Sequence, residues 1–166
     1  VERRQLAETG ILRCAFLLRD DVKTIHAATE VLAEAKLSPE LKNEALYYRA
    51  KAYKNQKADK KALDDFRELA KDTRNSYGAE AKYQVAQALY DAKEYAAAEK
   101  ELLNYIEQST PHAYWLARSF VLLSDVYVAM GKDLDARQYL LSLQQNYQGN
   151  DDIESMIEDR LKKLNK

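Results

Sequence analysis

Residues 79–108 read AEAKYQVAQALYDAKEYAAAEKELLNYIEQ and predict two amphipathic helices with a short turn at Lys93-Glu94. Small residues occupy the positions where two helices approach closely, at Ala86, Ala88 and Ala98. Large apolar residues at helical spacing lie between them, namely Tyr83, Val85, Leu89, Leu102, Tyr105 and Ile106. This pattern indicates a pair of helices packed against each other along their apolar sides.

The same layout recurs on both sides of this stretch. The small position of the first helix recurs as Ala50, Ala86 and Ser124, with separations of 36 (86 − 50) and 38 (124 − 86) residues. The small position of the second helix recurs as Ala62, Ala98 and Ala136 with the same two separations. Two independent landmarks with one period in the thirties predict a helical solenoid.

Start and stop signals divide the chain into nine expected helices. Helices are expected at about 2–18, 22–36, 39–56 and 60–74, then two in 79–108, one from 111 to Gly131, one at 133–147 and one from 151 onward. Ser38-Pro39-Glu40 and Thr110-Pro111 read as helix starts, Asp20 or Asp21 as a cap, and Asp151 with Glu154 as a capping box. Gly131 and Gly149 read as helix ends.

The repeat pattern resembles the tetratricopeptide repeat (TPR) family between about Asn43 and Tyr147. The resemblance implies an all-α, right-handed solenoid of about four helix pairs plus a C-terminal capping helix, in one domain over residues 1–166. The expected parts are a degenerate repeat at 1–38, repeats at 39–76, 77–109 and 110–148, and a cap at 150–165. The family usually has glycine in the turn inside each unit; here Lys57 and Lys93 occupy two of these turns.

The composition argues for a folded helical chain and against several classes of function. The 166 residues carry a net charge of −1, which gives no general attraction to nucleic acid or to an anionic membrane. Cys14 is the only cysteine, and its apolar neighbours predict a buried, inert thiol. His26 and His112 have no metal-ligand spacing, and no catalytic motif occurs. We therefore expect a non-enzymatic protein without a cofactor or metal.

The resemblance also implies a binding site. In TPR proteins the first helix of each unit lines a concave groove, and a protein or peptide partner binds there. Carried onto this sequence, the groove consists of Glu44, Tyr47, Lys51, Lys54, Asn55, Glu80, Tyr83, Gln87, Tyr90, Asp91, Arg118 and Asp125, with Val121, Val128 and Ala129 beside them. Tyrosine mixed with charged residues suits a protein-binding surface, but Tyr83 and Tyr90 are also compatible with packing between helices.

Two alternatives to groove binding stay open. The chain is also compatible with a structural role as the C-terminal end of a longer TPR solenoid. A more distant reading is an RNA-binding helical repeat, because Lys51, Lys54, Lys57, Lys60 and Lys61 lie near three tyrosines. The charge balance favours a solvated turn at these lysines.

The repeats are spaced more widely than is usual for the family, and this loose spacing resembles that of bacterial envelope TPR proteins. The resemblance implies a periplasmic or envelope location, while a cytoplasmic location stays open as an alternative. The polar outer side expected for the last helix, and the lack of a comparable cover at the first, predict that Lys166 lies near the natural end. By the same reasoning, Val1 is an artificial or processed start.

Overall fold

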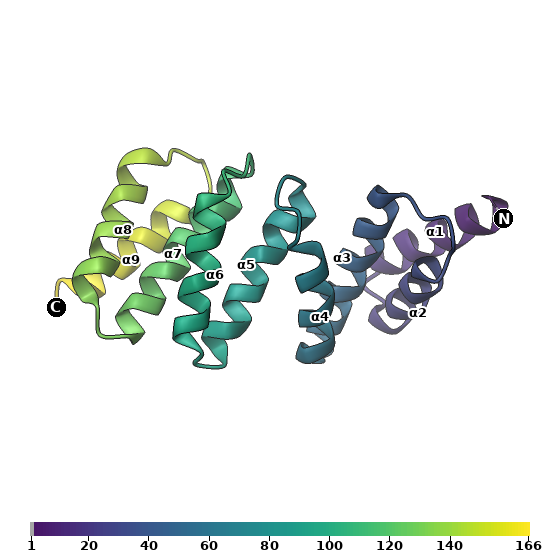
Figure 1. Cartoon of the computed structure of the whole chain (residues 1–166), viewed down its shortest axis with the longest axis horizontal. Coiled ribbons are helices and arrows are strands. Elements are labelled where there is room, and N and C mark those ends of the chain that lie inside the picture. The colour runs from purple at the N-terminus through teal and green to yellow at the C-terminus, as the bar shows by residue number, and fades with distance from the viewer. Residues whose placement is uncertain (1) are drawn as a thin grey trace. The chain divides into compact units, whose positions relative to one another are not determined.

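The computed structural model describes residues 2–166, which form nine α-helices and no β-strand (Figure 1). This confirms the all-α fold class. The helices are α1 (Glu2–Leu17), α2 (Asp21–Leu32), α3 (Pro39–Asn55), α4 (Asp59–Leu69), α5 (Ser76–Asp91), α6 (Tyr95–Glu107), α7 (Ala113–Ala129), α8 (Asp133–Asn146) and α9 (Ile153–Leu164). Eight of them form the four expected pairs.

The turn inside each pair has the same backbone geometry. One residue in each turn has a positive φ: Arg19 (57°), Lys57 (58°), Lys93 (61°) and Gly131 (74°). The following amide then reaches back to a carbonyl five residues earlier, as in Lys132 N to Tyr127 O at 2.8 Å and Glu94 N to Leu89 O at 2.9 Å. This left-handed helix ending favours glycine, but the lysines and Arg19 adopt it as well. The turn at Arg19 therefore makes α1 and α2 a helix pair of the same type.

Side-chain caps explain several helix starts. The Ser38 hydroxyl accepts from Leu41 N at 3.2 Å, and Pro39 occupies the first turn of α3, which confirms that start signal. Asp20, rather than Asp21, caps α2 by accepting from Lys23 N. Asn75 caps α5 by accepting from Gly78 N at 2.8 Å. Each cap satisfies an amide that has no partner inside its helix.

Two predicted start signals are wrong. The helix after Thr110-Pro111 begins at Ala113, because the Thr110 hydroxyl donates to the carbonyl of Thr73 at 2.8 Å and accepts from His112 N. The hydroxyl therefore fixes the α6–α7 connection and does not cap the helix. Asp151 forms no capping box either, since its carboxylate accepts from Ile153 N and the Tyr147 hydroxyl.

The ends of α2 and α4 also differ from the sequence expectation. These helices end at Leu32 and Leu69, four and five residues before the expected ends at 36 and 74. The residues that were expected to continue α2 and α4 instead form the connections to the next helix pairs. The Gln5 side chain donates to the carbonyl of Lys36 and holds the first of these connections.

Residues Val1–Asp72 form one compact unit, in which α1 packs on α2, α2 on α3 and α3 on α4. Its core contains Leu12, Ala27, Ala28, Val31 and Ala45. The first helices of the two pairs, α1 and α3, also touch each other. The pairs are therefore stacked in sequence order within this unit.

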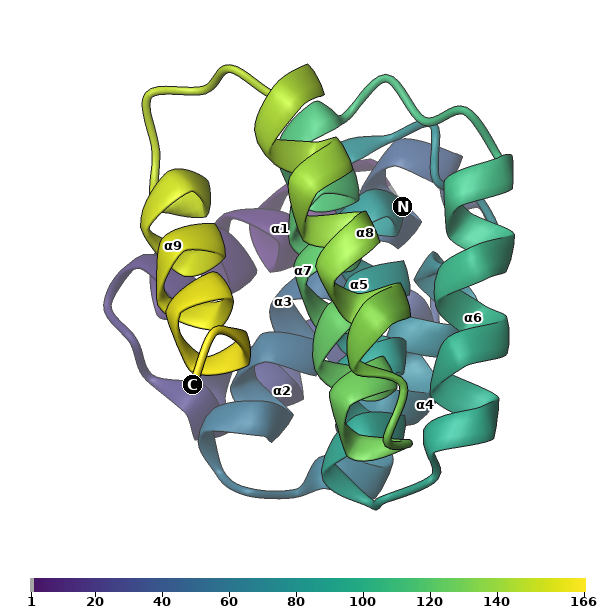
Figure 2. The same cartoon turned by 90° about the vertical axis from the view of Figure 1, so that its left-hand side faces the viewer.

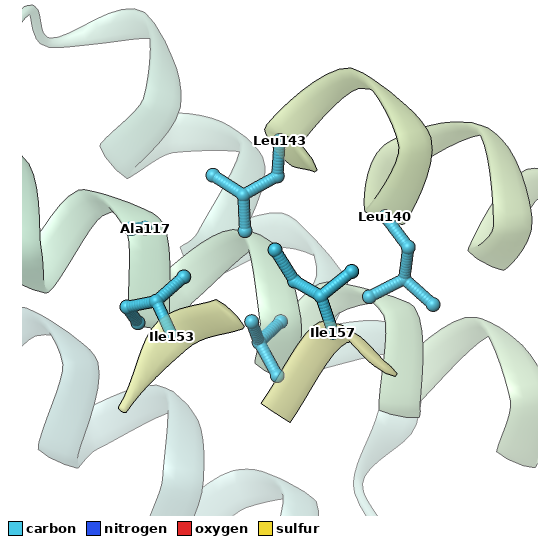
Figure 3. Close-up of a cluster of buried hydrophobic side chains, with 6 residues drawn as sticks. Ala117, Leu140, Leu143, Ile153 and Ile157 are labelled. Atoms are coloured by element: carbon cyan, nitrogen blue, oxygen red, sulfur yellow. The ribbon is translucent and has the colours of Figure 1, made fainter. Parts of the chain in front are cut away.

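Residues Thr73–Lys166 form the second compact unit, with the same stacking of α5 through α8. The last helix, α9, lies beside α8 and also contacts α7 (Figure 2). Figure 3 shows Ile153 and Ile157 of α9 among side chains of α7 and α8. The buried members of this cluster are Ala117, Val121, Leu140, Leu143, Ile153 and Ile157.

The small positions that recur in the repeat are buried, whereas Ala88 is only half-buried. Ala50, Ala86, Ala98 and Ala136 are each 0% exposed, and Ser124 is 1% exposed. In the first pair, the positions 38 residues before Ala50, Ala62 and Phe66 hold Leu12, Thr24 and Ala28, which are also buried. The first repeat thus has the same buried positions but different residue types, which explains why it looked degenerate in the sequence.

The position of Cys14 differs from the sequence prediction. Its side chain is exposed, so the prediction of a buried thiol is wrong. Leu12 and Ala15 face the core of the first unit, whereas Cys14 lies on the opposite side of α1. Sequence neighbours on a helix point in different directions, and apolar neighbours therefore do not establish burial.

Within residues 2–166, no group of three or more histidine, cysteine, aspartate or glutamate side chains could hold a metal ion. In the same part of the chain, no helix has both the length and the apolar character needed to cross a membrane.

Candidate protein-binding surface

In the first unit, the predicted groove residues lie along α3. Glu44 accepts two hydrogen bonds from the Arg13 guanidinium of α1, at 2.6 and 2.9 Å. These bonds lower the pKa of the Glu44 carboxyl below its usual value. Asn55 donates to the Asp21 carboxylate at 3.2 Å. The surface therefore extends to the first helix pair, through Arg13 and Asp21.

Two of the three tyrosines near the lysine run, Tyr47 and Tyr53, have cationic partners. The Lys51 ammonium lies 5.5 Å from the centre of the Tyr47 ring, and Lys61 lies 5.7 Å from the Tyr53 ring. Arg49 also lies over Tyr53, at 5.9 Å. Such cation–π contacts use the ring faces on which nucleic-acid bases would stack. This arrangement gives the RNA-binding reading no support.

In the second unit, Arg118 of α7 is the centre of the predicted surface. Its guanidinium lies 5.0 Å from the Tyr83 ring, 5.9 Å from the Trp115 ring and 6.0 Å from the Tyr114 ring. It donates hydrogen bonds to the hydroxyls of Tyr114 and Tyr83, at 3.1 and 3.2 Å. These contacts fix the side chain in one position, with 26% of it still exposed.

Three predicted groove residues are buried, and one of them, Val121, is a member of the core cluster of α7, α8 and α9. Tyr83 and Glu80 are each 6% exposed. The Tyr83 ring packs against Trp115 with a centroid distance of 5.6 Å, and its hydroxyl donates to Gln87 at 3.1 Å. Tyr83 therefore packs between α5 and α7 and supports the surface from below, as in the packing alternative.

Tyr90, Gln87 and Asp91 are the predicted groove residues of α5 that stay accessible. Gln87 donates to the Asp91 carboxylate at 2.9 Å, and Asp91 itself is exposed. Tyr90 is half-buried against Tyr95, with ring centroids 5.7 Å apart. Burial, followed by the nearby charge of Asp125, raises the pKa of the Tyr90 hydroxyl. The hydroxyl therefore stays protonated and able to donate.

Asp125 is already occupied by a residue that the sequence analysis missed. Arg160 of α9 donates two hydrogen bonds to its carboxylate, at 2.8 and 2.9 Å. Arg160 follows Asp125 by 35 residues, the same separation as between Tyr83 and Arg118. Hence α9 contacts α7 as α7 contacts α5. This recurring separation would have identified Arg160, had the last helix been read as the first helix of a further unit.

Tyr114, Trp115 and Asp152 were also missed as members of this surface. Tyr114 donates from its hydroxyl to Asp152 at 2.9 Å, and Arg118 lies 3.5 Å from the same carboxylate. Their contacts join residues 32 to 38 positions apart, which local periodicity does not reveal.

Comparison with known proteins supports the fold. The crystal structure of MamA, a TPR-containing protein, superposes with a TM-score of 0.67 and 21% sequence identity. The match covers 92% of this chain and 84% of MamA. No protein-family model matches the chain. No curated protein matches it either.

The structure and the MamA match define a TPR-like helical-repeat fold.

Proposed function

We propose that the chain is a non-enzymatic protein-interaction module. It binds a segment of a partner protein along the first helix of its helix pairs. The observation that carries the proposal is the accessible surface of the second unit, formed by Tyr90, Asp91, Gln87 and Arg118. It combines an aromatic ring and a fixed guanidinium, two groups that are enriched at the energetic centres of protein interfaces, with an exposed carboxylate. Arg118 and Gln87 are held by hydrogen bonds, so binding costs little ordering entropy.

The same residues indicate the chemistry of the partner segment. Asp91 accepts a hydrogen bond from Gln87 and has further lone pairs that a lysine or arginine of the partner can use. The half-buried Tyr90 ring suits an aliphatic or aromatic side chain. We therefore propose a partner segment in which a basic residue is next to an apolar one. A location in the bacterial envelope is part of the proposal through the sequence resemblance alone.

Site-specific photocrosslinking tests this function. A photoreactive phenylalanine analogue at Tyr90 should capture a defined partner. The same analogue at Leu134, an apolar side chain of α8 that is 79% exposed, should capture nothing specific. With the purified partner, Tyr90→Ala and Asp91→Asn should each weaken binding about tenfold, whereas Leu134→Ala should leave it unchanged.

Circular dichroism of each variant separates loss of binding from loss of fold. Tyr90 is only half-buried, so Tyr90→Ala should keep the helix content of the parent. Binding that survives both surface substitutions, or equal crosslinking from positions 90 and 134, would show that the partner uses another surface.

A further inference from the structure

The turn between α1 and α2 carries three exposed aliphatic side chains. Leu17 ends α1, Leu18 follows it, and Val22 lies in the first turn of α2. Their exposed fractions are 79%, 80% and 70%. Single exposed apolar residues are common on protein surfaces, whereas a group of them at one place marks a contact surface.

The second helix pair shows that the stacking of pairs does not cover side chains at these positions. The turn residues Arg19 and Lys57 are equivalent, so the three aliphatic residues correspond to Asn55, Gln56 and Lys60. The first pair packs on the second through α2 and α3, and yet these three side chains are exposed. A further helix packed on α1 in the same way would therefore leave the three aliphatic side chains in solvent. Their contact lies outside the repeat.

Basic residues of the second turn lie beside the aliphatic residues of the first. Asn55, at the end of α3, donates to the Asp21 carboxylate at the start of α2, at 3.2 Å. This hydrogen bond joins the two turns at the same end of the first unit. The exposed basic residues of the two turns are Arg19, Lys23, Lys57, Lys60 and Lys61.

The turns of the first unit are basic, whereas those of the second unit are acidic. Residues 17–23 and 55–61 contain five basic and three acidic residues, which give a net charge of +2 (5 − 3). The equivalent residues 91–97 and 129–135 contain two basic and four acidic residues, which give −2 (2 − 4). Two of the three acidic side chains in the first set, Asp20 and Asp21, accept hydrogen bonds from Lys23 N and Asn55. The basic side chains therefore determine the sign of the local electrostatic field.

Projecting aliphatic side chains next to exposed cations suit the surface of an anionic membrane. A lipid layer accepts side chains that stand out from a turn, whereas a peptide partner binds in a groove. Lysine and arginine beside them are attracted by anionic headgroups. Leu134 provides an internal contrast, because it is equivalent to Val22 and 79% exposed but belongs to an acidic turn.

We propose that the two turns of the first unit form a docking site for an anionic lipid surface. The aliphatic residues Leu17, Leu18 and Val22 enter the headgroup layer, and the basic residues of both turns bind the lipid phosphates. Three aliphatic side chains bury much less apolar surface than a lipid anchor, so the association is reversible. The site belongs to the first unit and is distinct from the partner-binding surface proposed for the second unit.

Flotation with lipid vesicles tests the docking site. The full chain should bind vesicles that contain roughly 30% phosphatidylglycerol in phosphatidylcholine, and it should not bind vesicles of phosphatidylcholine alone. An increase in salt from about 0.05 M to about 0.5 M should weaken the binding by roughly tenfold, because salt screens the attraction between the basic residues and the headgroups.

Two matched pairs of substitutions test the residues of the site. Lys57→Glu should weaken binding to the anionic vesicles by roughly tenfold, whereas Lys93→Glu, at the equivalent turn position, should leave it nearly unchanged. Val22→Ser should weaken binding by roughly fivefold, whereas Leu134→Ser should have no effect. All four side chains are exposed, so each variant should keep the circular dichroism spectrum of the parent.

A fluorescent label distinguishes insertion from adsorption by charge alone. In a Cys14→Ser background, an environment-sensitive dye attached to Leu18→Cys should shift its emission to shorter wavelength when anionic vesicles are added. The same dye attached to Leu134→Cys should keep its emission wavelength, because that turn stays in water.

Three results would overturn the proposal. Absence of binding to the anionic vesicles at low salt would show that these turns contact a protein rather than a lipid surface. Equal loss of binding in Lys57→Glu and Lys93→Glu would show general electrostatic adhesion without a site. An unshifted emission from the label at position 18 would show that the aliphatic residues do not enter the lipid layer.

Discussion

Ala97 and Ala98 are neighbours on α6 that differ only in their surroundings. Ala98 is 0% exposed at a helix crossing, while Ala97 is exposed. Ala98→Leu should overpack the crossing and lower the free energy of unfolding by about 1–3 kcal/mol. Ala97→Leu adds the same atoms at the surface and should change it by less than about 0.5 kcal/mol. Urea unfolding of both variants checks this, and equal stabilities would argue against the helix crossing at Ala98.

The contact between Arg13 and the Glu44 carboxyl should make the stability of the chain depend on pH. Its pKa in the folded chain is lowered, chiefly by the hydrogen bond from Arg13. A lowered pKa contributes stability above the unfolded-state value, and this contribution is lost as the pH falls through the folded value. From about pH 6 to about pH 3, the melting temperature of the parent should therefore fall more steeply than that of Glu44→Gln.

Glu107→Gln is the matched control, because Glu107 is an exposed carboxylate of α6 in the other unit. Its melting curve should keep the steep acid dependence of the parent. If Glu44→Gln had the same acid dependence as Glu107→Gln, the Arg13–Glu44 contact would contribute nothing in solution.

Sequence reasoning at this scale succeeded where the cause is local or periodic. The buried alanines follow from a spacing that repeats along the chain, because a small residue is needed at each crossing. It failed for Tyr83 and Cys14, whose surroundings depend on distant residues. Tyr83 is covered by Trp115 and Arg118, which are 32 and 35 positions away. Cys14 is exposed because no described helix packs on its side of α1.

The turns inside the helix pairs recur at the same sequence spacing as the helices that flank them. Arg19, Lys57, Lys93 and Gly131 follow one another at 38, 36 and 38 residues, the same spacing as the buried alanines. The sequence predicted the turns at Lys57 and Lys93 although the usual glycine is missing. The start of α7 could not be predicted, because it depends on the bond from Thr110 to Thr73, 37 residues earlier.

The lysine turns contain removable strain. Lys93 has φ 61°, a conformation that disfavours side chains with a Cβ atom by roughly 1 kcal/mol. Lys93→Gly should therefore raise the free energy of unfolding by about 0.5–1 kcal/mol, and Gly131→Lys should lower it by a similar amount. Thermal melts of the two variants measure these opposite shifts.

Lys100→Gly provides the contrast, because Lys100 is an exposed residue in the interior of α6. Glycine there should destabilise the helix by about 1 kcal/mol. If Lys93→Gly also lowered the melting temperature, the left-handed turn would not be the source of strain.

At the scale of the molecule, the chain consists of two compact units, each with its own core. The repeat spacing predicted the stacking of pairs within them. It did not reveal that α9 contacts α7 as a further first helix, because α9 has no second helix to complete a repeat landmark. Its amphipathic pattern did predict the apolar side, and Ile153 and Ile157 are buried as expected.

Removal of the last helix, α9, tests whether a truncation destabilises only the unit that contains it. A chain that ends at Asn150 loses Ile153 and Ile157 from the core cluster and uncovers Leu140 and Leu143. It also removes Arg160, which leaves Asp125 without its bidentate partner. A partly buried carboxylate that loses its partner and newly exposed apolar surface both destabilise the unit. We therefore expect faster amide hydrogen exchange in α7 and α8, and aggregation seen by light scattering.

Removal of residues 1–36 is the matching truncation at the other end. It takes α1 and α2 from the first unit but leaves the core cluster of α7, α8 and α9 complete. Amide exchange in α7 and α8 should then equal that of the full chain, even if α3 and α4 lose protection. The reason is that exchange reports the local free energy of opening, which depends on the contacts of each unit. Unchanged exchange in α7 after the cut at Asn150 would show that α9 does not act as a cap.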